Sequence, residues 1–360
     1  MEAVEVKTKK QQKRFLAFRQ KIYRENPIHV DNNSFMIKEL FAGRTSFVKD
    51  KEILVVNIED NGEILCQGMI VYARELPGYV QLCFFESSPG QEEAVNLLIK
   101  RATDIGRGYG CDRLVVGLNG HVNYGLGFLC SHYDCRNSFS ASVNPAYYND
   151  YFVNSEFEPI YLNSYRIHSF QDKIKKYESM INRINRSYTF RHFSKKDFEH
   201  DTRIYTDLNN ICFDGHRYYY PRTYAEDREM LKELFLFMKE DSVIFAFDGD
   251  KPVGFIMWYP DFNMLVKDGD AFGVKEFFKN ILFGATVKTG KVMEYGILEE
   301  YRKSGLAIGL VYQVFLCMQK RGMKDAESSW VLEENTDSNS ICNALCDEEY
   351  KRYVVYEKII

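Results

Sequence analysis

The sequence predicts an α/β (α+β) protein built from two tandem domains, each a mixed, mostly antiparallel sheet flanked by helices. The chain has 360 residues, which suits two domains of ordinary size better than one small core. Strand-like apolar runs alternate with amphipathic helical segments, as expected for a sheet with helices on its faces. Both halves also follow one order of elements: helix, hairpin, strand, helix, strand, helix, strand.

The first half contains the clearest hairpin signal. After an expected helix at 9–24, two β-rich runs at 53–58 and 64–72 flank Asn61-Gly62. Asn-Gly between such runs is typical of a tight hairpin turn. The remaining predicted elements are a strand at 80–85, a helix over about 94–105 with its apolar residues on one stripe, and strands at 113–118 and 161–168.

The second half repeats this plan. We expect a first domain at 1–170, a helical linker at 171–186 and a second domain at 187–360. An extra segment at 262–284 contains a predicted amphipathic helix at 271–283, which serves either as the wall of a binding site or as packing. The predicted elements are strand 187–193, helices from about 195 and at 225–239, strands 243–247 and 253–259, strand 292–298, a helix, strand 326–332, a short helix and strand 351–358.

Composition excludes several classes of function. A formal net charge of −4 and a pI near 6.1 argue against a nucleic-acid binder. No apolar run approaches the roughly 20 residues that span a bilayer, so no membrane partner is expected. Nine cysteines without a CxxC pair and no secretion signal indicate reduced thiols in a cytoplasm. Cys130 and Cys135 have the wrong spacing for common zinc sites, so no metal is expected.

One strand-to-helix turn carries the features of an anion site. Gly305 lies where a helix begins, and Ala307 opens its apolar stripe. Amide groups at a helix start point outward at the positive end of the helix dipole. Arg302 and Lys303 add positive charge, while small residues allow a diphosphate to approach the backbone.

This turn resembles the acyl-CoA pyrophosphate motif of the GNAT superfamily of N-acetyltransferases, V-x4-R/Q-x2-G-x-G/A. Ile297, Arg302, Gly305 and Ala307 match it, and the second half follows the family order of elements. Glu327, Ser329, Trp330, Leu332, Glu333 and Asn335 further resemble an E-x-S-W-x-L-E-x-N stretch of bacterial tandem-domain members. The resemblance implies acetyl-CoA or another acyl-CoA as co-substrate and no metal. The residues expected to bind it are Ile297, Leu298, Arg302, Lys303, Ser304, Gly305, Leu306, Ala307 and Asn335.

The first half lacks this loop. At the equivalent place, Ser88 is predicted to cap a helix, with Pro89 and Gln91 completing a capping box. Glu86 and two further glutamates at 92–93 would repel a diphosphate. The first domain is therefore expected to shape the acceptor pocket or to stabilise the second domain, and not to bind CoA.

The resemblance also suggests catalytic groups. The family reaction is attack of an amine on a thioester, which needs a base and a proton for the leaving thiolate. Glu294, on the motif strand, is the leading base candidate, and a surface carboxylate is the alternative. Glu333 is a second candidate. The family's tyrosine acid is replaced by Cys342, which is either a proton donor or a packing residue.

Three functions remain open on the sequence. The first is an acyl-CoA-dependent N-acyltransferase, acting on a small-molecule or peptide amine. The second is an aminoacyl transferase on a related tandem fold, and the third is a non-catalytic acyl-CoA-binding or partner-binding protein. An aromatic cluster at 216–220 either lines an acceptor pocket or fills a seam between domains. A homodimer is compatible with all three.

Overall fold

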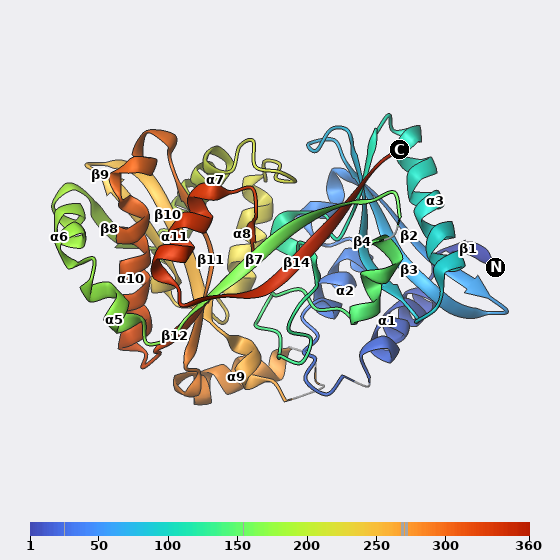
Figure 1. Ribbon diagram of the computed structural model, residues 1–360, viewed down its shortest axis with the longest axis horizontal. Coiled ribbons are helices and arrows are strands. Elements are labelled where there is room, and N and C mark those ends of the chain that lie inside the picture. Colours follow the sequence, from blue (N-terminus) through green and yellow to red (C-terminus); the bar gives the residue numbers. More distant parts are fainter. Residues whose placement is uncertain (25, 154, 268–269, 271–272) are drawn as a thin grey trace. The chain divides into compact units, whose positions relative to one another are not determined.

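The computed structural model of the chain (Figure 1) describes residues 1–24, 26–153, 155–267, 270 and 273–360. The chain forms two compact units. Unit 1 consists of Met1–Leu162, Lys267–Phe272 and Lys351–Ile360, and unit 2 of Asn163–Val266 and Gly273–Tyr350. The sequence analysis placed the end of the first domain at 170 and the start of the second at 187. The units of the structure depart most from these limits at the C-terminal end of the chain. Residues 351–360 belong to unit 1 because their strand pairs with a strand of that unit.

The sheet of unit 1 has the strand order β1-β2-β3-β4-β5-β14. β4 and β5 are parallel, and the other neighbours are antiparallel. The strands are β1 (Glu2–Glu5), β2 (Lys51–Asp60), β3 (Glu63–Ala73), β4 (Tyr79–Ser87), β5 (Arg113–Val116) and β14 (Glu348–Ile359), with β6 (Phe128–Leu129) beside β14. The helices are α1 (Lys9–Tyr23), α2 (Ser34–Ala42), α3 (Glu92–Gly108) and α4 (Asp150–Val153), with 3-10 turns η1 (Ser46–Lys49), η2 (Val122–Tyr124) and η3 (Ala146–Tyr148).

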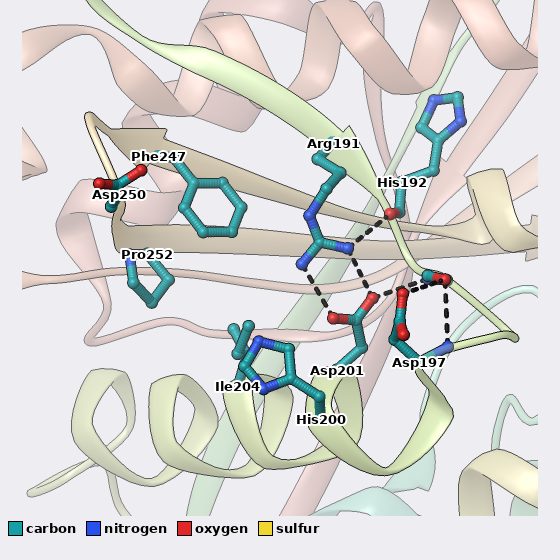
Figure 2. Close-up of a pocket in the computed structure, with 10 residues that line it drawn as sticks. Arg191, His192, Asp197, His200, Asp201, Ile204, Phe247, Asp250 and Pro252 are labelled. Carbon is teal, nitrogen blue, oxygen red and sulfur yellow. Dashed lines mark hydrogen bonds and ion pairs between the residues drawn. The ribbon is translucent and has the colours of Figure 1, made fainter.

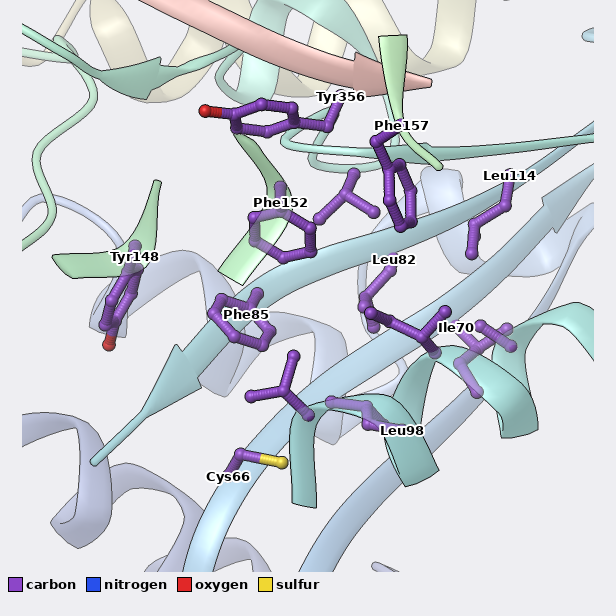
Figure 3. Packing of buried hydrophobic residues seen from close by; sticks show 14 of the residues in the cluster. Cys66, Ile70, Leu82, Phe85, Leu98, Leu114, Tyr148, Phe152, Phe157 and Tyr356 are labelled. Atoms are coloured by element: carbon purple, nitrogen blue, oxygen red, sulfur yellow. The ribbon is translucent and has the colours of Figure 1, made fainter. Parts of the chain in front are cut away.

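Helices cover both faces of the unit 1 sheet. Side chains along β3 alternate between the two faces of the sheet. Ile70 lies on one face, where it packs in a cluster with Leu82 of β4 and Leu98 of α3 (Figure 3). Met69 points to the other face, where Phe15 of α1 packs in a second cluster. The β2–β3 turn is the predicted Asn61-Gly62 hairpin, and both of its residues have positive φ, as a type I′ turn requires.

Unit 2 contains the sheet order β7-β12-β11-β10-β9-β8. β11 and β12 are parallel, and the remaining pairs in that series are antiparallel. The strands are β7 (Glu158–Ile167), β8 (Thr189–His192), β9 (Val243–Asp248), β10 (Lys251–Pro260), β11 (Thr289–Ile297), β12 (Asp325–Ser328) and β13 (Val331–Leu332). The helices are α5 (Phe170–Lys175), α6 (Glu178–Ser187), α7 (Phe198–Cys212), α8 (Tyr224–Leu234), α9 (Val274–Phe283), α10 (Leu306–Lys320) and α11 (Thr336–Leu345), with 3-10 turns η4 (Glu240–Ser242), η5 (Phe262–Leu265), η6 (Gly284–Thr286) and η7 (Glu299–Ser304).

A β-bulge at Met293 changes the faces to which the side chains of the last residues of β11 point. The pairing with β10 shifts there, because Met257 pairs with Glu294 while the next residue pairs with Val292. Before the bulge, a Cβ on Gly290 would meet Met318 of α10, whereas after it a Cβ on Gly296 would meet Cys212 of α7. Even-numbered residues therefore point to α10 before the bulge and to α7 after it.

The structure corrects several sequence predictions. α2 and β1 were not expected, and the strand predicted at 326–332 is broken into β12 and β13. The capping box at Ser88 is wrong, because α3 begins at Glu92 and its N-cap residue, Gln91, makes no side-chain cap bond. The predicted helix at 271–283 is present as α9 from Val274, and residues 271–272 lie outside the described part of the chain. Among the described residues, no helix is long and apolar enough to cross a membrane.

Candidate functional site

The turn between β11 and α10 carries the predicted anion-binding residues. η7 and Gly305, at φ 84°, join the two elements, and a left-handed residue is least strained as glycine. Arg302 and Lys303 are exposed, while Leu306 and Ala307 are buried. Two cations therefore lie at the surface beside the start of a helix of 15 residues.

The start of α10 is already partly occupied by the protein. The amide of Leu306 donates to Ser304 Oγ at 3.2 Å. A Cβ at Gly305 would lie 3.2 Å from Met180 Sδ and 3.5 Å from the Ile184 side chain, both on α6. The absence of a side chain at Gly305 therefore allows helix α6 to pack closely against this turn. What remains outside is the surface of η7 with its two cations.

Arg302 is tied to the neighbouring backbone. Its Nε donates to the Ile297 carbonyl at 3.4 Å and its Nη2 to the Cys212 carbonyl, at the end of α7, at 3.3 Å. Nearby Glu300 is paired with Lys251 at 2.9 Å. The pairing reduces the repulsion that Glu300 would exert on an anion at this turn.

β11 and β12 separate beside this turn. In the described residues their pairing ends at Val292 and Ser328, while β11 continues to Ile297. The Ser329 amide still donates to the Val292 carbonyl at 2.7 Å, and the chain then leaves β11. Ile297 and Leu298, both buried, remain paired with β10 and Val253 on the other side. Separated parallel strands leave one backbone edge of β11 facing the gap.

Glu294 points from β11 towards α7, on the face set by the bulge. Its Oε1 accepts a hydrogen bond from Tyr205, a fully buried residue of α7. Burial raises the pKa of the Glu294 carboxyl above its usual range, and the bond from Tyr205 opposes this shift. The guanidinium of Arg222 attracts this carboxylate, but it is also paired with Asp227, with 3.1 Å between Nε and Oδ1. Glu294 is thus a carboxylate that accepts protons more readily than a surface glutamate.

Tyr295 points to the opposite face and reaches α11. Its hydroxyl donates to Ser338 Oγ at 3.0 Å. Asn335, predicted to face the cofactor, is the N-cap of α11, and its Oδ1 accepts from the Ser338 amide at 3.1 Å. The gap between β11 and the segment after β12 is therefore bordered by a tyrosine hydroxyl and a helix start.

The two other predicted catalytic residues have different surroundings. Glu333 is exposed. Cys342 is half-buried, and its thiol is hydrogen-bonded to Cys346, four residues further along the chain. That bond, together with burial, raises the pKa of the Cys342 thiol, so Cys342 releases a proton less readily than an ordinary cysteine.

Tyr205, Tyr295 and Ser338 were missed by the sequence analysis. Tyr295 stands next to Glu294 in the motif strand but was given no role. Tyr205 lies 89 residues from its partner, and Ser338 lies 43 residues from Tyr295. No local pattern links residues so far apart, so only the fold could bring them together.

The aromatic cluster at 216–220 packs within unit 2. Tyr218, Tyr219 and Tyr220 are buried, and the Tyr219 hydroxyl donates to Asn209 Oδ1 of α7 at 2.9 Å. Arg217 pairs with Glu334 at 3.1 Å, which joins this loop to the segment after β12.

A separate hollow opens between β8, α7 and the β9–β10 turn (Figure 2). Its volume is about 620 Å³. Arg191 and Asp201 form a two-pronged ion pair at its wall, with N–O distances of 2.6 and 2.9 Å. Its lining consists of Arg191, His192, Ser194, Asp197, His200, Asp201, Ile204, Phe247, Asp250 and Pro252, none of which belongs to the predicted site.

In unit 1, the corresponding helix start is closed by a tyrosine. The Gln91 amide donates to the Tyr151 hydroxyl at 3.3 Å, and that hydroxyl donates to the Ser88 carbonyl at 2.6 Å. Glu86, near the end of β4, is fully buried, and it forms an ion pair with Arg19 of α1. The helix start of unit 1 is therefore partly closed by the Tyr151 side chain.

Three solved structures with TM-scores above 0.5 share the fold. A tandem GNAT protein from the clavulanic acid biosynthesis pathway has a TM-score of 0.57 at 10% identity, covering 99% of this chain and 98% of that one. A GCN5-related N-acetyltransferase from Sphaerobacter thermophilus has a TM-score of 0.52 at 12% identity, covering 99% and 95%. A GCN5-related glucosamine N-acetyltransferase region of a fungal multi-domain enzyme has a TM-score of 0.59 at 14% identity, covering 99% of this chain and 38% of that chain. The chain therefore has the tandem GNAT fold, as the sequence predicted.

Sequence comparison adds one relative. Protein YghO of Escherichia coli (strain K12) is 26% identical over 202 residues, which is 53% of this chain and half of the length of that protein. No family model matches the chain. In the described residues, no group of three or more His, Cys, Asp or Glu side chains is arranged to hold a metal ion.

Proposed function

We propose that the chain is an acyl-CoA-dependent N-acyltransferase, with acetyl-CoA as donor and a small-molecule or peptide amine as acceptor. The observation that carries the proposal is the separation of β11 from β12 next to Glu294. The edge of β11 beyond its last pair with β12 offers the peptide-like pantetheine arm a backbone to pair with. A carboxylate with a raised pKa beside that edge supplies a base for an ammonium group.

Phosphate binding is assigned to the turn η7, and proton removal to the α7 face of β11. The exposed cations Arg302 and Lys303 bind the linked phosphates from outside η7. Glu294, on the α7 side, takes a proton from the incoming ammonium. The free amine then attacks the thioester carbonyl carbon and the C–N bond forms. The nitrogen releases its second proton to solvent, and the C–S bond breaks to release CoA thiolate.

Calorimetric titration with CoA tests the phosphate contacts. The double variant Arg302→Glu with Lys303→Glu should bind CoA at least 10-fold more weakly, because two attractions become repulsions at an exposed anion site. Gly305 is unsuitable for such a test, since its positive φ and its contact with Met180 would strain any side chain.

The matched control is Lys232→Glu with Lys239→Glu, which makes the same change of charge at exposed positions of unit 2. Equal CoA affinity in both double variants would remove the assignment of η7.

A non-catalytic acyl-CoA-binding protein is the second candidate, because Cys342 occupies the place of the family tyrosine and its thiol is hydrogen-bonded to Cys346. Radiolabelled acetyl-CoA incubated with an amine panel separates the two. Labelled amide product supports the transferase, whereas CoA binding without product from any amine supports the second candidate.

A further inference from the structure

The departing thiolate of the proposed reaction needs a proton, and the residue at the expected position is poorly suited to give it. Cys342 shares a hydrogen bond with Cys346 and holds its own proton more tightly than a free thiol. Another proton donor must then border the gap between β11 and the segment after β12, or the thiolate leaves without being protonated.

Tyr295 brings a phenol to the same face of α11 from the other side. It lies on β11 beyond Val292, the last residue paired with β12, and its hydroxyl bonds to Ser338. Ser338 and Cys342 are four residues apart in α11, so they lie one turn apart on one helix face. The phenol thus reaches the helix one turn before the position where the family tyrosine would stand.

The bond to Ser338, at the start of α11, partly offsets the effect of burial on the anion that a proton donor becomes. Ser338 is in the first turn of a 10-residue helix, whose positive dipole end favours negative charge. Burial raises the pKa of Tyr295 to about 12 and also raises the pKa of Cys342, so both groups carry their protons at neutral pH, and the position of Tyr295 on β11 is what distinguishes it. The hydroxyl of Ser338 accepts from Tyr295 and offers a route for the proton to be replaced.

We propose that Tyr295, on β11, donates the proton to the leaving CoA thiolate in place of a tyrosine on α11, with Ser338 as its positioning residue. This inference rests on the proposed function. The C–S bond breaks with its electron pair on sulfur, the sulfur takes the proton from Tyr295 Oη, and the tyrosinate regains a proton through Ser338 from solvent. No oxidant, metal or further reactant is needed.

The test measures CoA release with the amine panel in the full chain. Tyr295→Phe should lower kcat about 100-fold, within the range for a general acid, while the Kd for CoA stays within about twofold. Cys342→Ala should change kcat less than threefold. Tyr312→Phe is the matched control, because it removes a half-buried phenol from α10 in the same unit.

A second variant distinguishes proton donation from packing. With 3,5-difluorotyrosine at position 295, the phenol keeps its shape but ionises at a lower pH, so the alkaline limb of kcat should move to lower pH. Wild-type kcat in Tyr295→Phe, or an unmoved limb in the fluorinated protein, overturns this inference and leaves the proposed function intact. A wild-type protein that binds CoA and releases none with any amine overturns both.

Discussion

Glu86 in unit 1 and Glu294 in unit 2 hold related places but have different surroundings. Each lies near the end of the strand that precedes a strand-to-helix turn, and each accepts a hydrogen bond from a tyrosine of the first long helix in its unit, Tyr23 or Tyr205. Glu86 also forms an ion pair with Arg19, whereas Glu294 forms none with the residues that the structure describes. The ion pair with Arg19 keeps Glu86 ionised. Glu294 has no such ion pair, and it can therefore exchange a proton.

The arginine of unit 1 should give the largest effect when removed. Arg19→Met would leave Glu86 and Asp31 buried without their cation, at a cost of about 3–5 kcal/mol in free energy of unfolding. Both tryptophans, at 258 and 330, belong to unit 2. In the variant, unit 1 should unfold at a lower urea concentration than unit 2. Circular dichroism should then fall before tryptophan fluorescence changes.

The control for this variant is Arg44→Met, which breaks the exposed pair with Glu39 and should cost less than about 1 kcal/mol. If Arg19→Met and Arg44→Met unfold alike, the buried pair does not hold unit 1 together.

The carboxylate of unit 2 should matter for turnover and not for folding. Glu294→Gln is expected to lower kcat/KM about 100-fold and to abolish its fall at acid pH. Because the folded pKa is raised, ionised Glu294 lowers stability as pH rises through that pKa, so the variant should melt at a higher temperature than wild type at pH 8. A variant that is both fully active and less stable would reverse the contrast with Glu86.

His29, in unit 1, should give a smaller, pH-dependent effect. It is buried and stacked on Tyr23, and burial with the nearby Arg19 lowers its pKa to about 3. The unfolded chain binds a proton near pH 6.5 and the folded chain does not, so stability is lost as pH falls below about 6.5, by at most about 1.4 kcal/mol per pH unit.

His29→Phe keeps the stacking and should flatten this loss between pH 6.5 and about 4, measured as urea midpoints. The same change at exposed His200 should leave the pH slope as in wild type. An unchanged slope in His29→Phe would show that another group titrates there.

Sequence patterns located most elements because their signals are local. The Asn61-Gly62 hairpin, the apolar stripe of α10 and the strand-to-helix turn at Gly305 all lie within short windows. The capping box at Ser88 failed because Tyr151, about 60 residues away, supplies the hydroxyl that closes that helix start. A motif gives residue types, and it does not give their distant partners.

In the candidate site, too, some features have local sequence signals and others depend on distant residues. Glu294 and the turn residues were predicted from the motif strand, but the bulge at Met293 that turns Glu294 towards α7 has no sequence signal of its own. Gly305 was predicted from the motif as a place where a diphosphate approaches the backbone, and its contacts with α6 likewise have no sequence signal. Both features come from tertiary packing.

The membership of residues 351–360 in unit 1 has a consequence for biosynthesis. β5 obtains its neighbour β14 only after about 190 further residues have been made beyond Leu162. At synthesis rates of about 5–20 residues per second, that delay is roughly 10–40 s. During this time the nascent chain presents an unpaired strand edge on the ribosome, where a chaperone has the opportunity to cover it.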